Sequence, residues 1–548
     1  MPVFAAPLCL MAVALPFLFA YTDAPISNFW PLLTSWVCGG VLLAVGAWPA
    51  RGAALERPDA AAWGRLLAGG LVAAAVVASA IGLIQYAAGD VGLAPWIHPT
   101  EPGQASGNLR QRNQQATLLA LGAWALLWAA LHGRHGLGLR WRPLPGYGAH
   151  AHHAPHVMLV VALIVVAVAC AATASRTGLV QWLLVVGLVA LWRHTGAAAD
   201  AEETQDTEAE AAAAELRAVE PLHLALLGAV VFLVAAWVLP EMLWWLQGVH
   251  ADALFHRFTD DSQPCTSRWV LWSNMLTLIA QKPWVGWGWG ELDYAHYITL
   301  FPGDRFCVLL DNAHNLPLQL AVELGLPAAV LMCGAFAAWC LRSRPWREVR
   351  PERQLAWGVL AIIGLHSMLE YPLWYGPFQI AALFALALLV WPRRPGRDAT
   401  TATAPVTAPT LILGMGAVLV WGVCALAAWD YFRVSQLYKA NTDRAAPYRD
   451  DVQSKVTQSV LFTNQLQFAQ LTTTPLTRDN AQRLNAMAKD LLHYSPEPRV
   501  IQLVVESAVM LGRDDEAAFH MKRYRIAYPK EYARWMGAAG SRASAEAR

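Results

Sequence analysis

The run Asp311-Asn312-Ala313-His314-Asn315 places polar side chains directly before an apolar stretch. A neutral imidazole such as that of His314 can accept a proton from a hydroxyl nucleophile. Asn315, Gln319 and Glu323 follow at i, i+4 and i+8, which places them on one face of a predicted helix. Polar residues on one face of an apolar helix favour an interior site. The alternative is a histidine that only caps the helix. The residues favour neither the catalytic base nor the capping histidine.

Arginine is the second residue type that could do chemistry. Arg176 lies in Ser175-Arg176-Thr177-Gly178, a tight turn between two apolar stretches, and Arg110, Arg112 and Arg268 also lie beside apolar stretches. A guanidinium binds phosphate through two parallel hydrogen bonds and stays charged at any working pH. Their convergence would make a diphosphate site. Contact with lipid headgroups or a surface ion pair is the alternative.

A third group is His366 and Glu370, one helical turn apart, followed by an aromatic run that ends at Tyr375. This pair could bind a second substrate or orient a base, although a local hydrogen bond that anchors the helix end is favoured. Gly286, Gly288 and Gly290 do not lie between a strand and a helix, so they predict a tight turn and not a nucleotide site.

The composition is that of a membrane protein. Of 548 residues, 56% are hydrophobic and 14% are charged, whereas soluble chains have about 25% charged residues. The 26 tryptophans fit a chain with many membrane–water boundaries. The net charge of +1 and the lack of a basic stripe give no indication of nucleic-acid binding.

Apolar stretches of about 20 residues predict spanning helices. We predict eleven, at 3–20, 32–49, 66–88, 114–132, 157–174, 178–192, 222–244, 316–341, 355–369, 376–391 and 409–430. Arginines gather in every second loop, which places those loops in the cytoplasm. They are Arg51, Arg57, Arg65, Arg134, Arg140, Arg142, Arg193, Arg217, Arg342, Arg344, Arg347, Arg350, Arg353, Arg393, Arg394 and Arg397.

The predicted fold is therefore all-α, with residues 1–432 as a transmembrane domain and residues 433–548 as an outward, helical domain. The loop 245–314 is the largest outward loop and ends at His314. Helical periodicity at Val500–Met510 and Glu516–Tyr528 is similar in spacing to a tetratricopeptide unit. Cys265 and Cys307 share the outward, oxidising loop and are predicted to form a disulfide.

The segment HNLPLQLAVELGLPAA, residues 314–329, resembles the signature of the O-antigen ligase superfamily: His-Asn, nine residues, then Gly325. Ala328 stands where that pattern usually has Gly, Thr or Tyr. Five further segments resemble the PglL-type bacterial protein O-oligosaccharyltransferases. They are GNLRQRNQQATLLALG (107–122), ASRTG (174–178), CTSRWVLW (265–272), GWGWGELDYAH (286–296) and HSMLEYPLWYGPF (366–378).

The resemblance implies a GT-C-like glycosyltransferase of the bacterial inner membrane, metal-independent and without a cofactor, with its site and C-terminal domain in the periplasm. The donor would be an oligosaccharide on undecaprenyl diphosphate, and the acceptor a Ser or Thr of a periplasmic protein such as a pilin. His314 would be the catalytic base, and Arg176, Arg268 and Arg112 would bind the diphosphate. Supporting or acceptor-binding residues would be Gln111, Asn113, Gln114, Asn315, Glu323, His366, Glu370 and Tyr375.

Loss of the acceptor proton to His314, in line with the departing diphosphate, would invert the anomeric configuration. Enzymes that join glycan to lipid A core, or that polymerise glycan repeats, share the donor and the site and remain alternatives. A transporter or flippase for the lipid-linked sugar is the alternative from another class. Transporters commonly show inverted repeats and broken helices, and the sequence indicates neither.

Overall fold

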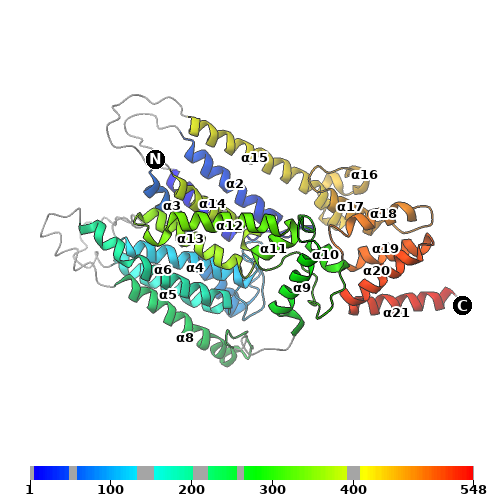
Figure 1. Cartoon of the computed structure of the whole chain (residues 1–548), viewed down its shortest axis with the longest axis horizontal. Helices are drawn as coiled ribbons and strands as arrows, with labels where there is room; N and C mark the ends of the chain where they lie inside the picture. The colour runs from blue at the N-terminus through cyan, green and yellow to red at the C-terminus, as the bar shows by residue number, and fades with distance from the viewer. Residues whose placement is uncertain are drawn as a thin grey trace. The chain divides into compact units, whose positions relative to one another are not determined.

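The computed structural model describes residues 5–48, 59–132, 154–201, 220–255, 264–391 and 408–546, and every regular element in these ranges is a helix (Figure 1). The predicted all-α fold class is thus confirmed. The chain divides into two compact units, Met1–Asp260 with Cys340–Ala425, and Asp261–Trp339 with Leu426–Arg548. The predicted membrane and outward domains, divided at residue 432, stay a prediction.

The first unit contains the helices on either side of the large loop. They are α1 (Ala5–Leu18), α2 (Phe29–Gly46), α3 (Ala60–Ala88), α4 (Arg112–Leu131), α5 (Ala154–Ala172), α6 (Arg176–Ala201), α8 (Pro221–Gln247), α13 (Pro351–Ser367), α14 (Gly376–Val390) and the first part of α15 (Ala408–Ser435). Two 3-10 helices belong to it, η5 (Pro345–Arg347) and η6 (Pro372–Trp374).

The second unit joins the large loop to the C-terminal region. Its helices from the loop side are α9 (Arg268–Gln281), α10 (Leu292–Ile298), α11 (Leu316–Leu324) and most of α12 (Leu326–Ser343), and the end of α15 also belongs to it. Its C-terminal helices are α16 (Val452–Lys455), α17 (Thr463–Thr473), α18 (Ala481–Leu491), α19 (Pro498–Met510), α20 (Asp514–Ala527) and α21 (Pro529–Glu546). Its 3-10 helices are η4 (Pro264–Thr266), η7 (Gln436–Tyr438), η8 (Asn441–Asp443) and η9 (Ala446–Tyr448).

Seven described helices are long and apolar enough to cross a membrane, so the protein is a multi-pass membrane protein. They are Phe29–Gly46, Ala60–Ala88, Arg112–Leu131, Arg176–Arg193, Pro221–Gln247, Leu326–Arg347 and Thr410–Tyr438. Three apolar helices are shorter, Ala5–Leu18, Val157–Ala172 and Gly376–Val390. The predicted number of eleven is not confirmed by this set. Most of the arginines that predict the orientation lie in 49–58, 133–153, 202–219 and 392–407, outside the described residues.

One predicted helix is wrong in its continuity. The stretch 316–341 forms two helices, α11 and α12, which are separated at Gly325, where φ is +84°. The backbone of the Gly-rich turn crosses here: Leu326 N–H donates to the Pro283 carbonyl at 2.8 Å. A Cβ on Gly325 would lie 2.3 Å from the Trp284 carbonyl oxygen. The sequence indicates no broken helices, which counts against a transporter. Because this helix is broken, helix continuity no longer argues against one.

The predicted tight turn in the Gly-rich segment is confirmed. Gly286, Gly288 and Gly290 all have positive φ, and a Cβ on Gly286 would lie 2.3 Å from the Glu323 carbonyl oxygen. Trp287 N–H donates to the Val322 carbonyl at 2.8 Å, so the turn lies directly against the end of α11. This contact positions the helix that follows His314.

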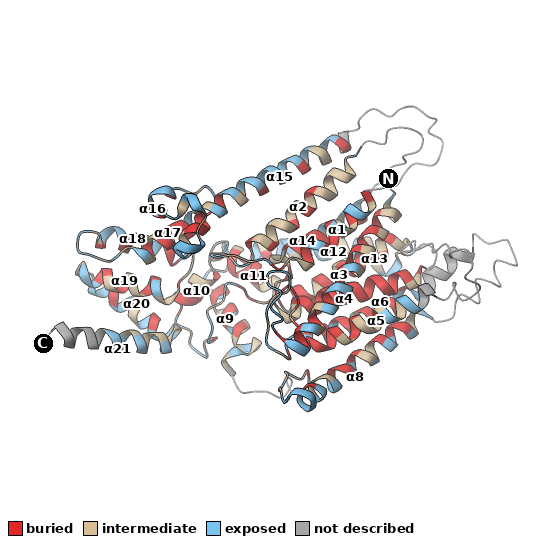
Figure 2. Cartoon of the chain, turned by 180° about the vertical axis from the view of Figure 1, so that it is seen from behind, coloured by how far each residue is buried: buried red, intermediate tan, exposed pale blue. Residues whose placement is uncertain are grey.

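Helix α4 is the most buried of the candidate spans, and α15 is largely exposed, as Figure 2 shows. Small residues allow the close packing of α4: a Cβ on Gly358 in α13 would overlap the Trp124 indole at 2.2 Å. Trp124 then donates from Nε1 to the Leu355 carbonyl at 3.1 Å, and Trp128 to that of Pro351 at 2.7 Å. Close backbone approach with satisfied indole donors is how spanning helices associate without a hydrophobic driving force.

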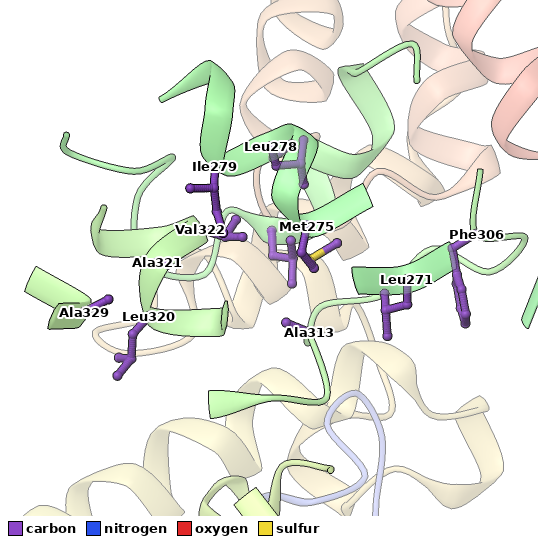
Figure 3. Close-up of a cluster of buried hydrophobic side chains, with 12 residues drawn as sticks. Leu271, Met275, Leu278, Ile279, Phe306, Ala313, Leu320, Ala321, Val322 and Ala329 are labelled. Carbon is purple, nitrogen blue, oxygen red and sulfur yellow. The ribbon is translucent and has the colours of Figure 1, made fainter. Parts of the chain in front are cut away.

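In the second unit, a cluster of buried apolar side chains includes Ala313, the residue before His314 (Figure 3). Leu271, Met275 and Leu278 of α9 pack with Val322 of α11 and with Ala313, which is fully buried. Burial of this apolar surface anchors the residue next to His314.

Candidate functional site

Each of the three predicted diphosphate-binding arginines is the first residue of a helix. Arg112 begins α4, Arg176 begins α6 and Arg268 begins α9. A cation at a helix N-terminus opposes the helix dipole, at a cost of about 0.3–1 kcal/mol. The same N-terminus favours an anion. An arginine at this position lowers helix stability, but together with the helix N-terminus it favours the binding of a phosphate group.

In each of these three helices, the residue before the arginine caps the helix N-terminus with a side-chain oxygen. Gln111 accepts from Gln114 N–H at 2.7 Å, Ser175 from Gly178 N–H at 3.1 Å, and Ser267 from Val270 N–H at 3.3 Å. These caps fix the first turn and therefore the direction in which the arginine leaves the helix. Gln111 thus has a structural role that the sequence did not predict.

Within the first unit, the Asn113 side-chain amide joins the start of α4 to the turn before α6 and to the segment after α13. Its Nδ2 donates to Glu370 Oε1 at 2.9 Å, and its Oδ1 accepts from the Ser175 hydroxyl at 2.7 Å. Ser175 and Glu370 are buried, while Arg176, next to Ser175, is exposed. The network holds the turn before α6 against the start of α4, so that a charged side chain is presented from a rigid base.

Glu370 N–H donates to the His366 carbonyl at 2.8 Å, and the His366 ring reaches another helix. Its Nδ1 lies 2.7 Å from the Thr117 hydroxyl, and the Thr117 hydroxyl accepts from Gln181 Nε2 at 2.8 Å. The Glu370 carboxylate accepts from Asn113. His366 is fully buried, and its ring joins α13 to α4 and α6. Polar residues inside apolar helices are the signal that could have indicated Thr117 and Gln181.

The remaining residues of the first unit have varied surroundings. Arg112 Nη1 pairs with Asp252 Oδ2 at 2.7 Å, and both side chains are partly exposed. Gln114 is fully buried, and neither its oxygen nor its nitrogen has a hydrogen-bond partner among the described residues. Tyr375 is half-buried, with its ring 6.3 Å from that of Tyr371.

In the second unit, His314 lies in a turn that its neighbours determine. Its φ is +51°, a conformation that non-glycine residues rarely adopt. His314 N–H donates to Asn312 Oδ1 at 2.9 Å, and Ala313 N–H donates to Gln319 Oε1 at 2.6 Å. Asn315 then caps α11 by accepting from Leu318 N–H at 3.0 Å. A strained residue that several hydrogen bonds hold is a common feature of functional sites.

Glu323 ends the polar stripe of α11 and is 2% exposed. Its Oε1 accepts from Gly290 N–H at 3.0 Å, and its backbone carbonyl accepts from Gly288 N–H at 3.0 Å. The carboxylate thus joins α11 to the Gly-rich turn, which is a positioning contact.

Arg268 stands close in sequence to a disulfide. Cys265 and Cys307 are bonded, with their Cα atoms 5.4 Å apart, and Cys307 N–H donates to the Cys265 carbonyl at 3.3 Å. The bridge closes the loop that contains α9 and α10. It holds the segment before Arg268 to the segment that leads into His314.

The comparisons with known proteins agree with this arrangement. Residues 161–333 match O-Antigen ligase, which includes Arg176, Arg268 and His314. Residues 105–129 match Protein glycosylation ligase, and residues 354–542 match the C-terminal part of Virulence factor membrane-bound polymerase. This confirms the resemblance to the PglL-type members of the O-antigen ligase superfamily.

A curated relative points the same way. The General O-oligosaccharyltransferase of Acinetobacter baylyi (strain ATCC 33305 / BD413 / ADP1) is 29% identical over 177 residues, which is 32% of this chain. The match spans 28% of the relative's own length.

Proposed function

We propose that the protein is an O-linked protein oligosaccharyltransferase that moves a glycan from undecaprenyl diphosphate to a Ser or Thr hydroxyl. The observation that carries the proposal is the match of residues 105–129 to Protein glycosylation ligase. This segment supplies Arg112 and Asn113, and Asn113 is the amide that holds the Arg176 turn. The relative's name supports the same reaction.

In this mechanism the acceptor hydroxyl loses its proton to the His314 imidazole as its oxygen attacks the anomeric carbon. The bond from that carbon to the diphosphate oxygen breaks, and undecaprenyl diphosphate leaves with the electron pair. The transition state has oxocarbenium character, and negative charge grows on the leaving group. Arg176 and Arg268 are proposed to bind that charge, because cations that stabilise a growing negative charge accelerate transfer.

The product should have the inverted anomeric configuration, which NMR of the glycopeptide linkage measures. A retained anomer would reject direct displacement. The inner membrane, the periplasmic side for the site, and pilin-like acceptors belong to this same proposal. The donor lipid is held in the membrane, so the site and the acceptor protein must meet it at the same membrane face.

The test uses the full-length protein, undecaprenyl-diphosphate oligosaccharide and a pilin-like acceptor in EDTA. His314→Ala is expected to lower the transfer rate by about 10²–10⁴-fold, as loss of a general base does, without changing donor binding. His250→Ala is the control, because His250 stacks on Trp244 at 3.9 Å and has no proposed chemical role. Equal transfer by wild type and His314→Ala would refute the role of His314.

Arg268 is tested by donor binding. Arg268→Ala and Arg268→Lys should both weaken it, because an ammonium group cannot reproduce the two parallel hydrogen bonds of a guanidinium. Full recovery by lysine would indicate a point charge and not a bidentate contact.

A glycan polymerase is the second candidate, because residues 354–542 match the C-terminal part of a membrane-bound polymerase. It predicts that wild type extends lipid-linked glycan and leaves protein unmodified. Ligation to lipid A core would show as glycan on that lipid. Either product would keep the donor and the site and change the acceptor.

A further inference from the structure

The C-terminal helices have a contact that the proposed reaction does not use. Helix α10, which comes from the large loop, packs against them: Tyr297 is 1% exposed and belongs to a core with Leu484, Ile501 and Tyr524. In both Figure 1 and Figure 2, α10 lies beside α20. A face of the C-terminal helices is therefore occupied by the chain's own loop.

Three polar contacts fix α10 there. The Tyr297 hydroxyl lies 3.0 Å from His520 Nδ1, and Arg523 Nε donates to the Ile298 carbonyl at 2.7 Å. At the other end of α10, His493 Nδ1 lies 2.7 Å from Glu291 Oε2. The two ends of α10 are thus held by α20 and by the segment that follows α18.

The same helix leads directly to the His314 turn. Gly290, next to Glu291, donates to the Glu323 carboxylate at 3.0 Å. Glu323 lies one turn after Gln319 on α11, and Gln319 accepts from the amide of Ala313. Every link in this series is a described contact inside one compact unit.

We propose that the C-terminal helices position the His314 turn through α10, with Glu323 as the positioning residue that connects them. Because α10 packs against the C-terminal helices, these helices act on the loop that ends at His314. The kinetic consequence rests on the proposed function, whereas the structural consequence does not.

The structural test is amide hydrogen exchange on the full-length protein in detergent. Arg523→Ala removes a charge-assisted hydrogen bond to α10, and should speed exchange about tenfold in α10 and about threefold at Ala313 and His314. Lys522→Ala is the matched control, since Lys522 is an exposed neighbouring cation. Residues 107–118 of the other unit should exchange at the wild-type rate in both variants.

Tyr297→Phe deletes only the hydroxyl that faces His520, so it decides the matter if Arg523→Ala loosens the whole unit. Faster exchange in α10 with unchanged exchange at Ala313 and His314 would overturn the proposal. It would show that the C-terminal helices hold α10 and that the turn is fixed independently.

The kinetic test separates position from charge at Glu323. Glu323→Ala cannot accept from Gly290 and should lower kcat at least about tenfold, with the acceptor KM and donor binding unchanged. Glu323→Gln keeps an acceptor oxygen and should recover most of that rate. Equal losses in both variants would assign Glu323 a charge or a proton instead of a position. If wild type transfers no glycan to protein, the proposed function fails while the exchange result still stands.

Discussion

Gly325→Ala is the substitution that most directly tests how the site is positioned. At φ +84° the added methyl group is strained, and it would lie 2.3 Å from the Trp284 carbonyl oxygen and 2.9 Å from Val285 N. These are backbone atoms, so no side chain can rotate away to make room. The α11–α12 corner must therefore move away from the Gly-rich turn.

The magnitude follows from what that movement breaks. The disfavoured φ/ψ costs about 1–3 kcal/mol. Loss of one crossing hydrogen bond, such as that from Leu326 N–H to the Pro283 carbonyl, costs about 1 kcal/mol more. Together these give about 2–4 kcal/mol, or roughly 30-fold to 1,000-fold faster exchange of the Leu326 and Trp287 amides. A shift of about 1 Å at His314 would lower the transfer rate about 100-fold.

The assay combines amide exchange with the glycan-transfer rate, using Gly334→Ala as the matched control. Gly334 lies inside α12, and apart from the nearby backbone of its own helix no described atom lies within 4 Å of the position where its Cβ would be, so this change should be neutral or stabilise by about 1 kcal/mol. If Gly325→Ala keeps wild-type exchange and transfers glycan at more than half the wild-type rate, the crossing does not position His314. A reading of Gly325 as a residue needed for packing would then be wrong.

Three further predictions concern other parts of the chain. Asn113→Ala removes the amide that donates to the buried Glu370 carboxylate. It should destabilise the protein by about 1.5–3 kcal/mol in thermal melting and weaken binding of the glycan donor in titration. An unchanged melting temperature would contradict this. Burial lowers the pKa of His520 to about 4, with the nearby cations Arg523 and Lys489 adding to the effect and Glu516 opposing it. The unfolded chain therefore binds the proton first, so this stability is complete above about pH 6.5 and is lost as the pH falls through about 4; His520→Gln should flatten the acid limb of the melting curve, and an unaltered limb would refute the assignment. Reduction of the Cys265–Cys307 bridge, which spans 42 residues, should destabilise the loop by about 4 kcal/mol in the chain-entropy model, seen as a lower melting temperature under reductant that the double Cys→Ser variant reproduces.

Much of the fold is determined locally, and the sequence predicts that part well. Long apolar stretches predict helices because backbone groups in lipid must be satisfied within the segment. The periodicity at Val500–Met510 and Glu516–Tyr528 corresponds to α19 and α20. The motif order was enough to recognise the resemblance to the O-antigen ligase superfamily, because each motif occupies a contiguous segment that needs no knowledge of its partners.

Side-chain partners are another matter, as His366 and Asn113 show. His366 and Glu370 are one helical turn apart and share a backbone hydrogen bond, and the structure also joins their side chains to Thr117 and Asn113, about 250 positions earlier in the chain. Burial decides this choice, since a buried polar group must find a partner wherever the packing places one. Sequence spacing has no information on which distant helix will lie alongside.

The break at Gly325 has both a local and a tertiary cause. By hydropathy, residues 316–341 are one helix, but Gly325 and Pro327 stand two residues apart inside the stretch, and both residue types disfavour a helix interior. The helix ends there because the Gly-rich turn crosses at backbone distance, with Trp287 N–H bonded to the Val322 carbonyl at 2.8 Å. The sequence by itself determined the all-helical fold class, the resemblance to a superfamily and the residue types able to do chemistry. Only the tertiary structure decided how those residues are held, because their positions depend on backbone and buried polar contacts between segments far apart in the chain.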